Sequence, residues 1–386
     1  MAGQDKLHVV VFTDTFFETN GVGSYYRTLL NWCRGRQDFQ VTVICPARDD
    51  LEAAQATDDV IPVRSLIDWK NPFYRDLTIG YFYQPMLRRI VRELAGSKVV
   101  HVATSGPLGV GGAVLARRMG LPLVGCYHTD LNHYARLYGQ SVLGRPGAWV
   151  GAKVAAVCDK LAYGRCEAIS APTESAARAV RSFYDGPTAV IPNPVDVDWF
   201  HPGTSRQGRF RDRYGRGPRV LAAVVGRVAK EKNLDLVCEL LGSDRRLAPV
   251  FVGDGPYAPT LRRRWGAEVT GFLHGQDLRE AYQQSDLFVS LSESETFGLS
   301  LAEALACGLP AMVLRSQGLA DSIPKGAGVD VLEKEDLPTL ADRCVALVSD
   351  RVLHAECSRR VRDFVLHLGA DVVVPKFVGF HGAHAR

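Results

Sequence analysis

The sequence predicts an α/β protein with two Rossmann-like domains that face each other across a cleft, and three observations support this prediction. The chain has 386 residues, which is long enough for two domains with separate hydrophobic cores. Short apolar runs of strand length alternate with helical patterns in both halves, as in parallel sheets covered by helices on both faces. A stretch rich in proline and glycine, at residues 192–218, separates the two halves.

The first domain is predicted over residues 1–195. It opens with a continuous apolar strand at 7–12, a loop that ends in Asn20-Gly21-Val22-Gly23, and a helical pattern through Trp32. This strand, glycine loop and helix are the usual opening of a doubly wound domain. Further strands are predicted at 41–45, 99–102, 123–127, 168–171 and 189–191, with helices at 85–94 and 148–162 among the segments between them.

The second domain is predicted over residues 218–363, after a linker at 196–217. It repeats the alternation of strands and helices. Strands are predicted at 220–226, 249–253, 268–271, 286–291, 311–314 and 328–331, and helices at 234–241, 278–284, 299–306 and 337–349.

Composition indicates a soluble globular protein and excludes several classes. The net charge of +4 is mild for this length, so no nucleic-acid partner is expected. Nine scattered cysteines without a CxxC pair are typical of reduced thiols in a cytoplasmic protein, not of disulfides or zinc ligands. No run approaches about 18 apolar residues, and the first residues lack the apolar region of a signal peptide.

The stretch at 292–310 predicts an anion site. It places a short helix, with its N-terminus near Gly298, directly after a strand. The first amides of a helix have no partner inside the helix and favour negative charge. Glu295 and Glu303 put carboxylates beside the same point. A nucleotide sugar satisfies both features, because its phosphates suit the amides and its hydroxyls suit the glutamates.

Two cations follow the first strand of the second domain. Arg227 and Lys232 lie five residues apart at the carboxyl end of that strand, where ligands bind in such sheets. A guanidinium fork and an ammonium point charge would bind a diphosphate and stabilise it as a leaving group without a metal. The alternative is a solvated charge cluster, the interpretation preferred for Lys230.

The spacing of Glu295 and Glu303, with Thr-Phe-Gly-Leu between them and Ala-Cys-Gly-Leu-Pro after, resembles the signature of glycosyltransferase family 4, whose members are retaining enzymes of the GT-B fold. The Gly-Arg and Glu-Lys pairs at 226–232 resemble the family's donor-phosphate motif. The resemblance implies hexose transfer from a nucleoside-diphosphate sugar to an acceptor hydroxyl, with no metal and no cofactor. It also implies that the segment 364–386 crosses back to the first domain.

The resemblance also assigns roles within the donor site. The amides of Gly298 and Leu299 would bind the diphosphate with the two cations, Glu303 the ribose and Glu295 the hexose. The loop with Gly253 resembles the segment near the nucleoside, and Gly271 begins the one that contacts the base. The implied donor-binding set is Gly21, Val22, Gly23, Arg227, Lys232, Gly253, Gly271, Phe272, Leu273, Glu295, Phe297, Gly298, Leu299 and Glu303, and the implied catalytic set is His128, Arg227, Lys232 and Glu295.

Four features of the sequence keep two interpretations. His128 follows a strand and matches the family's histidine at the cleft mouth, although a lone histidine is also commonly structural. Asp14 would contact the acceptor or cap a helix, and Tyr134 would line the acceptor pocket or pack a helix. Asp196-Val-Asp198 resembles a metal-binding DxD motif, but it lies in the interdomain segment and is interpreted as structural, so no metal site is predicted.

The partners are only partly defined. A nucleoside-diphosphate sugar is the expected donor, and the acceptor is a lipid, a glycan or a small metabolite. The base, the hexose and the linkage are not determined. An amphipathic basic stretch with Tyr81, Tyr83, Leu87 and Arg88 fits either peripheral contact with the inner face of a membrane or an ordinary core-facing helix.

Other functions are weighed against transfer. A catalytically inactive nucleotide-sugar-binding protein of the same fold is the main alternative. A phosphorylase of the same architecture would need a lysine for pyridoxal phosphate, and no stretch proposes one. A nicotinamide-dependent oxidoreductase would need G-x-G-x-x-G in the first turn, but Tyr26 occupies the position of the third glycine after Gly21 and Gly23.

Overall fold

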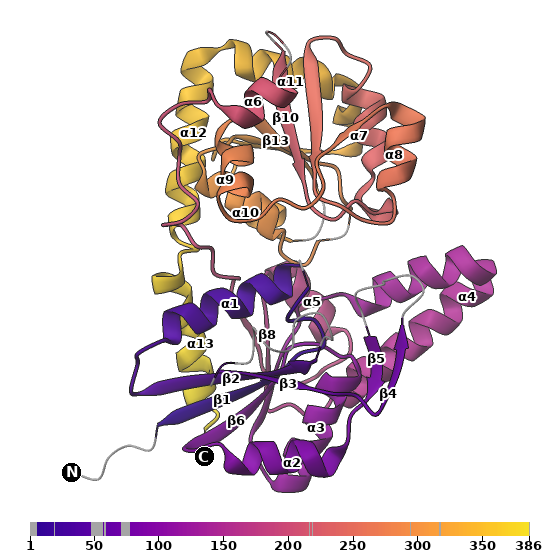
Figure 1. The fold of residues 1–386 in the computed structure, drawn as a ribbon, viewed down its shortest axis with the longest axis vertical. Coiled ribbons are helices and arrows are strands. Elements are labelled where there is room, and N and C mark those ends of the chain that lie inside the picture. The colour runs from indigo at the N-terminus through magenta and orange to yellow at the C-terminus, as the bar shows by residue number, and fades with distance from the viewer. Residues whose placement is uncertain are drawn as a thin grey trace. The chain divides into compact units, whose positions relative to one another are not determined.

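The computed structural model describes residues 6–18, 20–47, 57, 59–70, 78–215, 217, 219–293, 295–315 and 318–385. The chain divides into two compact units (Figure 1). The first unit contains Met1–Pro194 and Ala370–Arg386, and the second contains Val195–Gly369. Each unit is built on one parallel sheet flanked by helices, so the prediction of two Rossmann-like α/β domains is confirmed.

The first unit has a seven-stranded parallel sheet in the order β3-β2-β1-β6-β7-β8-β9. Val9, Val10, Val11 and Phe12 of β1 are fully buried, because helices cover both faces of this central strand. The strands are β1 (Leu7–Phe12), β2 (Phe39–Pro46), β3 (Val60–Val63), β6 (Ser97–Val102), β7 (Leu123–Cys126), β8 (Ala168–Ala171) and β9 (Thr188–Val190), with an antiparallel pair β4 (Ile67–Lys70) and β5 (Thr78–Tyr81) beside them in sequence.

The helices of the first unit come from both ends of the chain. They are α1 (Gly21–Cys33), α2 (Gln84–Glu93), α3 (Pro107–Met119), α4 (Leu131–Tyr163), α5 (Glu174–Arg181) and α13 (Ala370–Gly382). Phe377 of α13 is buried in the core beside Tyr25 of α1, and Trp32 donates from Nε1 to Asp371 Oδ1 at 2.7 Å. The C-terminal segment is therefore part of the core of this unit.

The second unit has a six-stranded parallel sheet in the order β12-β11-β10-β13-β14-β15. Its strands are β10 (Val220–Val225), β11 (Leu247–Val252), β12 (Glu268–Val269), β13 (Leu287–Ser290), β14 (Ala311–Leu314) and β15 (Val329–Leu332). Its α-helices are α6 (Arg209–Tyr214), α7 (Leu234–Leu241), α8 (Ala258–Trp265), α9 (Gly275–Gln283), α10 (Leu299–Ala306), α11 (Leu340–Ser349) and α12 (Arg351–Leu366), and its 3₁₀ turns are η1 (Lys230–Lys232), η2 (Leu319–Ser322) and η3 (Lys334–Thr339).

Each sheet has a point at which the strand order reverses. In the first sheet it lies between β1 and β6, and in the second it lies between β10 and β13. In open α/β sheets, the loops that leave such neighbouring strands diverge and form a crevice at the carboxyl edge, where ligands bind. The strand order therefore selects the loops after β10 and β13, and those after β1 and β6, as candidate site loops.

Most predicted elements of the second unit are confirmed. The limits of α7, α10 and β14 match the prediction, and the other predicted strands shift by one or two residues. In the first unit α3 was not predicted, because Pro107-Leu-Gly-Val-Gly-Gly resembles a loop. A Cβ on Gly112 would lie 2.4 Å from the Phe12 ring, so the glycine allows α3 to pack closely on the sheet. All nine cysteines are free in the structure, and seven of them are buried, as their positions inside apolar runs of the sequence lead one to expect.

The amphipathic basic stretch around α2 proves to be a core-facing helix. Phe82, Leu87 and Val91 are buried in the hydrophobic core of the first unit. The basic residues of α2 lie on its exposed side, together with Tyr83 before its first turn. The side chain of Tyr81 lies outside the described residues. Since the apolar face of α2 is already covered, this helix does not offer an apolar surface to a membrane.

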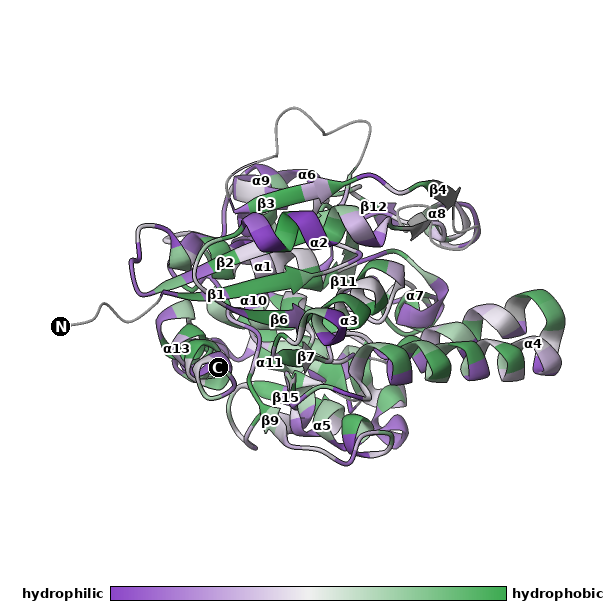
Figure 2. Cartoon of the chain, turned by 90° about the horizontal axis from the view of Figure 1, so that it is seen from below, coloured by the Kyte–Doolittle hydropathy of each residue, from purple (hydrophilic) through white to green (hydrophobic). Residues whose placement is uncertain are grey.

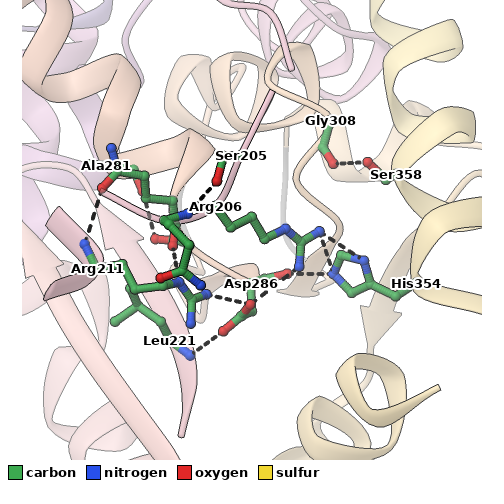
Figure 3. Close-up of polar contacts among 12 residues, drawn as sticks. Ser205, Arg206, Arg211, Leu221, Ala281, Asp286, Gly308, His354 and Ser358 are labelled. Atoms are coloured by element: carbon green, nitrogen blue, oxygen red, sulfur yellow. Dashed lines mark hydrogen bonds and ion pairs between the residues drawn. The ribbon is translucent and has the colours of Figure 1, made fainter. Parts of the chain in front are cut away.

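The predicted linker, residues 196–217, lies in the second unit, where Asp286 binds part of it (Figure 3). The buried Asp286 carboxylate pairs with Arg211 at 2.5 Å and with Arg206 at 3.3 Å, and accepts the Leu221 amide at 2.8 Å. His354 of α12 donates from Nε2 to the Asp286 carbonyl oxygen at 2.8 Å. The cluster lies at the amino end of β13, opposite the candidate ligand edge, so we assign it a structural role.

Replacing Asp286 by asparagine is expected to destabilise the protein by about 2 kcal/mol, because the Arg206 and Arg211 guanidiniums lose the negative charge with which they pair. Urea unfolding would measure the change. Asp277→Asn is the matched control: Asp277 is exposed and 3.7 Å from Arg209, and such exposed pairs contribute less than about 1 kcal/mol. Equal stability of the two variants would contradict the assigned role of Asp286.

Candidate active site

The loop after β10 carries both predicted phosphate ligands. Arg227 follows Gly226 directly, and Lys232 ends the 3₁₀ turn η1. The Arg227 guanidinium forms an ion pair with the buried carboxylate of Glu231. Lys232 Nζ lies 2.5 Å from Glu295 Oε1, on the loop after β13. The two cations are thus oriented by carboxylates, and Glu231 is a residue of this cluster that was not predicted from the sequence.

The loop after β13 lies beside the first loop across the reversal of strand order. Asn233, in the left-handed conformation with φ of 53°, donates from its side chain to the Leu291 carbonyl oxygen at 3.0 Å. This bond joins the end of η1 to the end of β13. The Lys232–Glu295 contact lies on the same edge, so the structure brings the cations and the predicted anion site together.

The N-terminus of α10 opens on this loop. Gly298 precedes the helix with φ of 89°, a conformation that side-chain-bearing residues rarely adopt. Among the described residues, and leaving aside its two neighbours in the chain, an added Cβ there would find only Leu301 Cβ within 4 Å, at 3.9 Å, so these residues leave the approach to the first turn open on that side. Phe297 is buried, and its carbonyl oxygen accepts the Leu319 amide at 2.7 Å. The peptide at Gly298 is therefore fixed by the packing of its neighbour.

Close backbone contacts pack the loop after β11 against the loop after β10. A Cβ on Gly253 would lie 2.0 Å from the Gly226 carbonyl oxygen, which explains the requirement for glycine. Gly253 also forms an isolated bridge with Gly271 of the loop after β12. The Phe272 side chain beyond it is 44% exposed. The predicted nucleoside and base loops therefore adjoin the phosphate loop, and Phe272 presents an aromatic face to solvent.

Glu303 lies one turn into α10 and is partly buried. The Tyr282 hydroxyl donates to Glu303 Oε2 at 2.9 Å. Burial raises the pKa of Glu303 to about 7, and the bond from Tyr282 acts in the opposite direction. Two hydroxyls of a bound ribose would donate to the ionised form and favour it. The affinity for a ribose-containing ligand is therefore expected to fall as the pH drops below this pKa.

In the first unit, Asp14 binds the start of α3. One carboxylate oxygen accepts the Leu108 amide at 2.8 Å, and the other accepts the Thr104 hydroxyl at 2.6 Å and the Gly109 amide at 3.2 Å. Burial raises the pKa of Asp14, and these hydrogen bonds oppose the shift. Of the two interpretations left open for this residue, the structure provides the capping contacts, which link the ends of β1 and β6.

His128, after β7, begins a buried chain of hydrogen bonds. His128 Nε2 is 3.1 Å from the Tyr26 hydroxyl, which is 2.7 Å from His101 Nε2. His101 Nδ1 is 2.9 Å from His381 Nε2, and His381 Nδ1 is 2.7 Å from the Phe377 carbonyl oxygen. These hydrogen bonds connect the end of β7 through α1 and β6 to α13. Tyr26, His101 and His381 were not predicted from the sequence, although a histidine inside the apolar run of β6 indicates a buried polar partner.

Burial and this series of hydrogen bonds define the charge and the tautomer of each histidine. Burial lowers the pKa of His128 to about 3, that of His381 to about 4, and that of His101 well below its usual value, so all three are neutral near pH 7. The Phe377 carbonyl only accepts, which makes His381 Nδ1 a donor and Nε2 an acceptor. His101 Nδ1 then donates to His381 Nε2, and the Tyr26 hydroxyl donates to His101 Nε2. The Tyr26 oxygen therefore accepts from His128, so Nε2 is the protonated nitrogen of His128. Nδ1 of His128 is then a hydrogen-bond acceptor and not a source of protons.

The remaining predicted site residues of the first unit lie on helices that follow β1 and β7. Val22 and Gly23 are buried in the first turn of α1, and the Gly23 amide binds the side chain of Asn20 at 2.8 Å. Gly23 is therefore engaged in capping its own helix. Tyr25, one turn on, packs its ring 4.6 Å from that of His128. Tyr134 lies on α4 with its ring stacked on Tyr138 at 6.4 Å, so packing explains part of its position.

Asp196 of the DxD sequence has a local structural contact. Its carboxylate accepts the Trp199 amide at 2.9 Å and closes a turn. In the described part of the chain, no group of three or more histidine, cysteine or acidic residues is placed to bind a metal. The structural interpretation of Asp196 agrees with this turn.

Two doubly wound parallel sheets with their loops and terminal helix define a protein of the GT-B class of glycosyltransferase folds. A model of Glycosyltransferase Family 4 matches residues 19–199, and a model of Glycosyl transferases group 1 matches residues 219–350. The chain belongs to glycosyltransferase family 4 and is a hexosyltransferase, as the resemblance of its motifs predicted.

Glycosyltransferases with similar sequences support the assignment to this family. A GDP-mannose-dependent alpha-mannosyltransferase of Mycobacterium tuberculosis is 30% identical over 384 residues, which cover 98% of this chain and 97% of that protein. The sulfoquinovosyl transferase SQD2 of Arabidopsis thaliana is 31% identical over 264 residues, 66% of this chain. That alignment spans 49% of the length of SQD2.

Among solved structures, HepE of Anabaena in complex with UDP and glucose is similar in fold. The TM-score is 0.75 and the sequence identity is 15%, with 97% of this chain and 99% of that chain covered. At this identity the likeness concerns the fold alone. The residue roles assigned to this chain therefore rest on its own sequence and geometry.

Proposed function

We propose that this chain is a retaining glycosyltransferase that transfers a hexose from a nucleoside-diphosphate sugar to an acceptor hydroxyl without a metal ion. One observation carries the proposal. Arg227 and Lys232 adjoin the open N-terminus of α10 on two loops that flank the reversal of strand order in the second sheet. Two fixed cations and a helix N-terminus are together suited to a diphosphate.

Each residue of this site then has a defined task. Arg227, oriented by Glu231, and Lys232, oriented by Glu295, bind the diphosphate oxygens with the Gly298 and Leu299 amides. Glu295 also accepts hydroxyls of the hexose. Glu303 accepts the ribose hydroxyls, and the glycine loops at Gly253 and Gly271 receive the nucleoside, with Phe272 and Leu273 beside the base.

The residues of the first unit complete the proposal. His128 Nδ1 accepts a hydrogen bond from a hydroxyl of the donor sugar, because the buried hydrogen bonds keep the proton of His128 on Nε2. Gly21 and Val22 present the first-turn amides of α1 to the sugar phosphate. Tyr134 contacts the acceptor, whereas Asp14 acts through α3.

The reaction needs no protein nucleophile. The bond between the anomeric carbon and the diphosphate oxygen breaks, and the acceptor oxygen bonds to the same face of that carbon. The acceptor proton passes to the departing phosphate oxygen, whose negative charge the two cations stabilise. Configuration at the anomeric carbon is retained, which proton NMR of the first product would establish.

GDP-mannose is the first donor to test. A relative that aligns over 98% of this chain is named as GDP-mannose-dependent, whereas UDP and glucose occur in the HepE complex. We therefore propose a GDP-hexose donor, with a UDP-hexose as the alternative. The acceptor is a lipid, a glycan or a small metabolite.

GDP at about 100 times its dissociation constant is expected to raise the free energy of unfolding by about 2.7 kcal/mol in the presence of a chelator. Thermal unfolding with GDP, UDP and ADP in parallel would measure this and rank the bases. If none of the three stabilised the protein in chelator, while one did so with a divalent ion, metal-free binding would be refuted.

The second candidate is a nucleotide-sugar-binding protein that does not catalyse transfer. The ion pairs that occupy Arg227 and Lys232 in this structure would suit a binding protein equally well. The two candidates differ in turnover. Hydrolysis or transfer of the bound donor identifies an enzyme, whereas stable binding of an intact donor over many hours, with every acceptor class present, identifies a binding protein.

A further inference from the structure

Helix α4 is folded back on itself. Its regular helix is interrupted at Leu143 and Gly144, where Gly144 has φ of 62° and ψ of −145°, and Pro146 begins the next turn. The two arms are residues 131–142 and 145–163, and we call them together the α4 hairpin. Figures 1 and 2 show the hairpin extending away from the sheet of the first unit.

Small residues join the two arms. A Cβ on Gly139 would lie 2.2 Å from the Gly147 carbonyl oxygen, and a Cβ on Gly147 would lie 2.1 Å from that of Gly139. One turn further, a Cβ on Gly151 would lie 2.3 Å from the Ala135 carbonyl oxygen. The backbones thus touch directly, as small residues allow in helices that pack within lipid. At these turns the backbones leave no space between the arms for large apolar side chains.

The large apolar side chains lie on the outside instead. Val150, Val154, Val157 and Leu161 are all exposed and recur at helical spacing, so they form one stripe along the second arm. At the tip, Leu143 is 69% exposed and Trp149 is 65% exposed. Seven of the 17 exposed large apolar side chains found in the described residues belong to this one hairpin. Figure 2 shows the hydrophobic colour along both arms.

The exposed charges of the hairpin have one sign. Its exposed ionic residues are Arg136, Arg145, Lys153 and Lys160. Its single acidic residue, Asp159, is buried. Lys153 and Lys160 run beside the apolar stripe on the second arm, and Lys153 Nζ lies 5.8 Å from the centre of the Trp149 ring. An apolar stripe edged by cations, with an aromatic side chain near its end, is complementary to the headgroup region of an anionic bilayer.

We propose that the α4 hairpin docks this protein on the surface of a bilayer that contains anionic lipids, with the stripe of Val150, Val154, Val157 and Leu161 against the acyl chains. A second copy of the chain is a poorer occupant, since a symmetric pairing of this face would bring Lys153 and Lys160 against the same cations. Within the described residues, no helix is both long and apolar enough to cross a membrane.

The proposal goes beyond the proposed function and is tested without donor or acceptor. Its connection to the site is Tyr134, which lies on the first arm and which we assign to the acceptor. A lipid surface at the hairpin would present a lipid acceptor to that arm. Failure of vesicle binding would remove the docking surface and leave glycosyl transfer to other acceptors untouched.

The full chain is expected to co-sediment with vesicles of equimolar phosphatidylglycerol and phosphatidylcholine, and not with phosphatidylcholine vesicles alone. Val150→Ser/Val154→Ser/Val157→Ser should weaken this binding at least about tenfold, because three apolar side chains leave the acyl region. Lys153→Gln/Lys160→Gln should weaken it roughly 30-fold at low salt.

Matched controls use exposed residues of other helices. Val352→Ser/Leu353→Ser on α12 removes apolar surface of similar size, since Val352 is 80% exposed, and Arg88→Gln/Arg92→Gln on α2 removes two exposed cations. Both controls should bind as the unchanged protein does. Binding that is absent, or that falls equally in the controls, would overturn the proposal. So would self-association in the absence of vesicles that the triple serine variant abolishes.

Fluorescence locates the contact independently of affinity. Trp149 emission should shift to shorter wavelength with anionic vesicles and be quenched by lipids brominated near the headgroup end of the acyl chain. Trp149→Phe should remove that quenching while the other tryptophans remain. If quenching persisted in Trp149→Phe, the bound surface would lie elsewhere and the assignment to α4 would be wrong.

Discussion

Replacement of Lys232 by alanine is expected to lower kcat/KM for the donor by about 10³-fold, the loss typical of removing one fixed group that stabilises developing charge. In the proposed reaction the departing diphosphate gains charge in the transition state, and Lys232 is one of the two cations that we propose to stabilise it. The change also removes the 2.5 Å contact that orients Glu295. Most of the loss should appear in kcat, because the interaction strengthens as the bond to the sugar breaks.

Lys230→Ala provides the matched control. Lys230 lies two residues earlier in the same 3₁₀ turn and is exposed. Its removal should leave kcat/KM within about twofold, since an exposed charge away from the ligand contributes little. Steady-state kinetics with GDP-mannose, together with circular dichroism to compare the folded variants, would measure both. Unchanged turnover in a folded Lys232→Ala protein would refute the assignment of this lysine.

Acidification from about pH 7.5 to about pH 5 is expected to lower the free energy of unfolding by up to roughly 6 kcal/mol through the three histidines of the buried chain. Burial lowers the pKa of His128, His381 and His101 in the folded protein. At a pH below about 6.5, the usual pKa of histidine, each of these imidazoles binds a proton in the unfolded state but stays neutral in the folded state. The unfolded state therefore gains protons as the pH falls, and stability is lost between that pH and the folded pKa values near 3 to 4.

The variant His381→Leu separates this cause from general acid sensitivity. It removes one of the three groups, so the slope of unfolding free energy against pH should become shallower by about 1.4 kcal/mol per pH unit. At neutral pH the variant should be less stable, because His101 Nδ1 loses its acceptor. Urea unfolding at three pH values measures the slopes, and equal slopes for the unchanged protein and His381→Leu would contradict the account.

Much of the fold was predictable because secondary structure leaves a local trace in the sequence. The continuous apolar run of β1 and the helix formers between Gly298 and Gly308 define their elements within one short window. The first arm of α4 and the whole of α3 escaped prediction, because Gly144, Pro146 and the glycines after Pro107 resemble loop signals. In the structure, glycines of these helices contact a neighbouring element, as Gly112 does with Phe12 and Gly139 with Gly147. A local stretch of sequence does not show which element will pack against it.

The candidate site divides in the same way. Arg227, Lys232, Glu295 and Gly298 lie within two short motifs, so the sequence indicated them, and their roles stay predictions until tested. Their orientation by Glu231 and Asn233 depends on where the loops after β10 and β13 meet. No spacing along the chain encodes that meeting, since it follows from the order of strands in the sheet.

By itself the sequence determined the two-domain α/β class and the positions of most strands to within about two residues, and it indicated the residues that we propose for a diphosphate site. Only the tertiary structure decided that Asp14 caps α3, that Tyr26, His101 and His381 connect to His128, and that α4 exposes its apolar side chains. The physical reason is range. Helical and strand periods act over a few residues, whereas a buried polar group is satisfied by whatever partner folding brings to it, here up to 280 residues away.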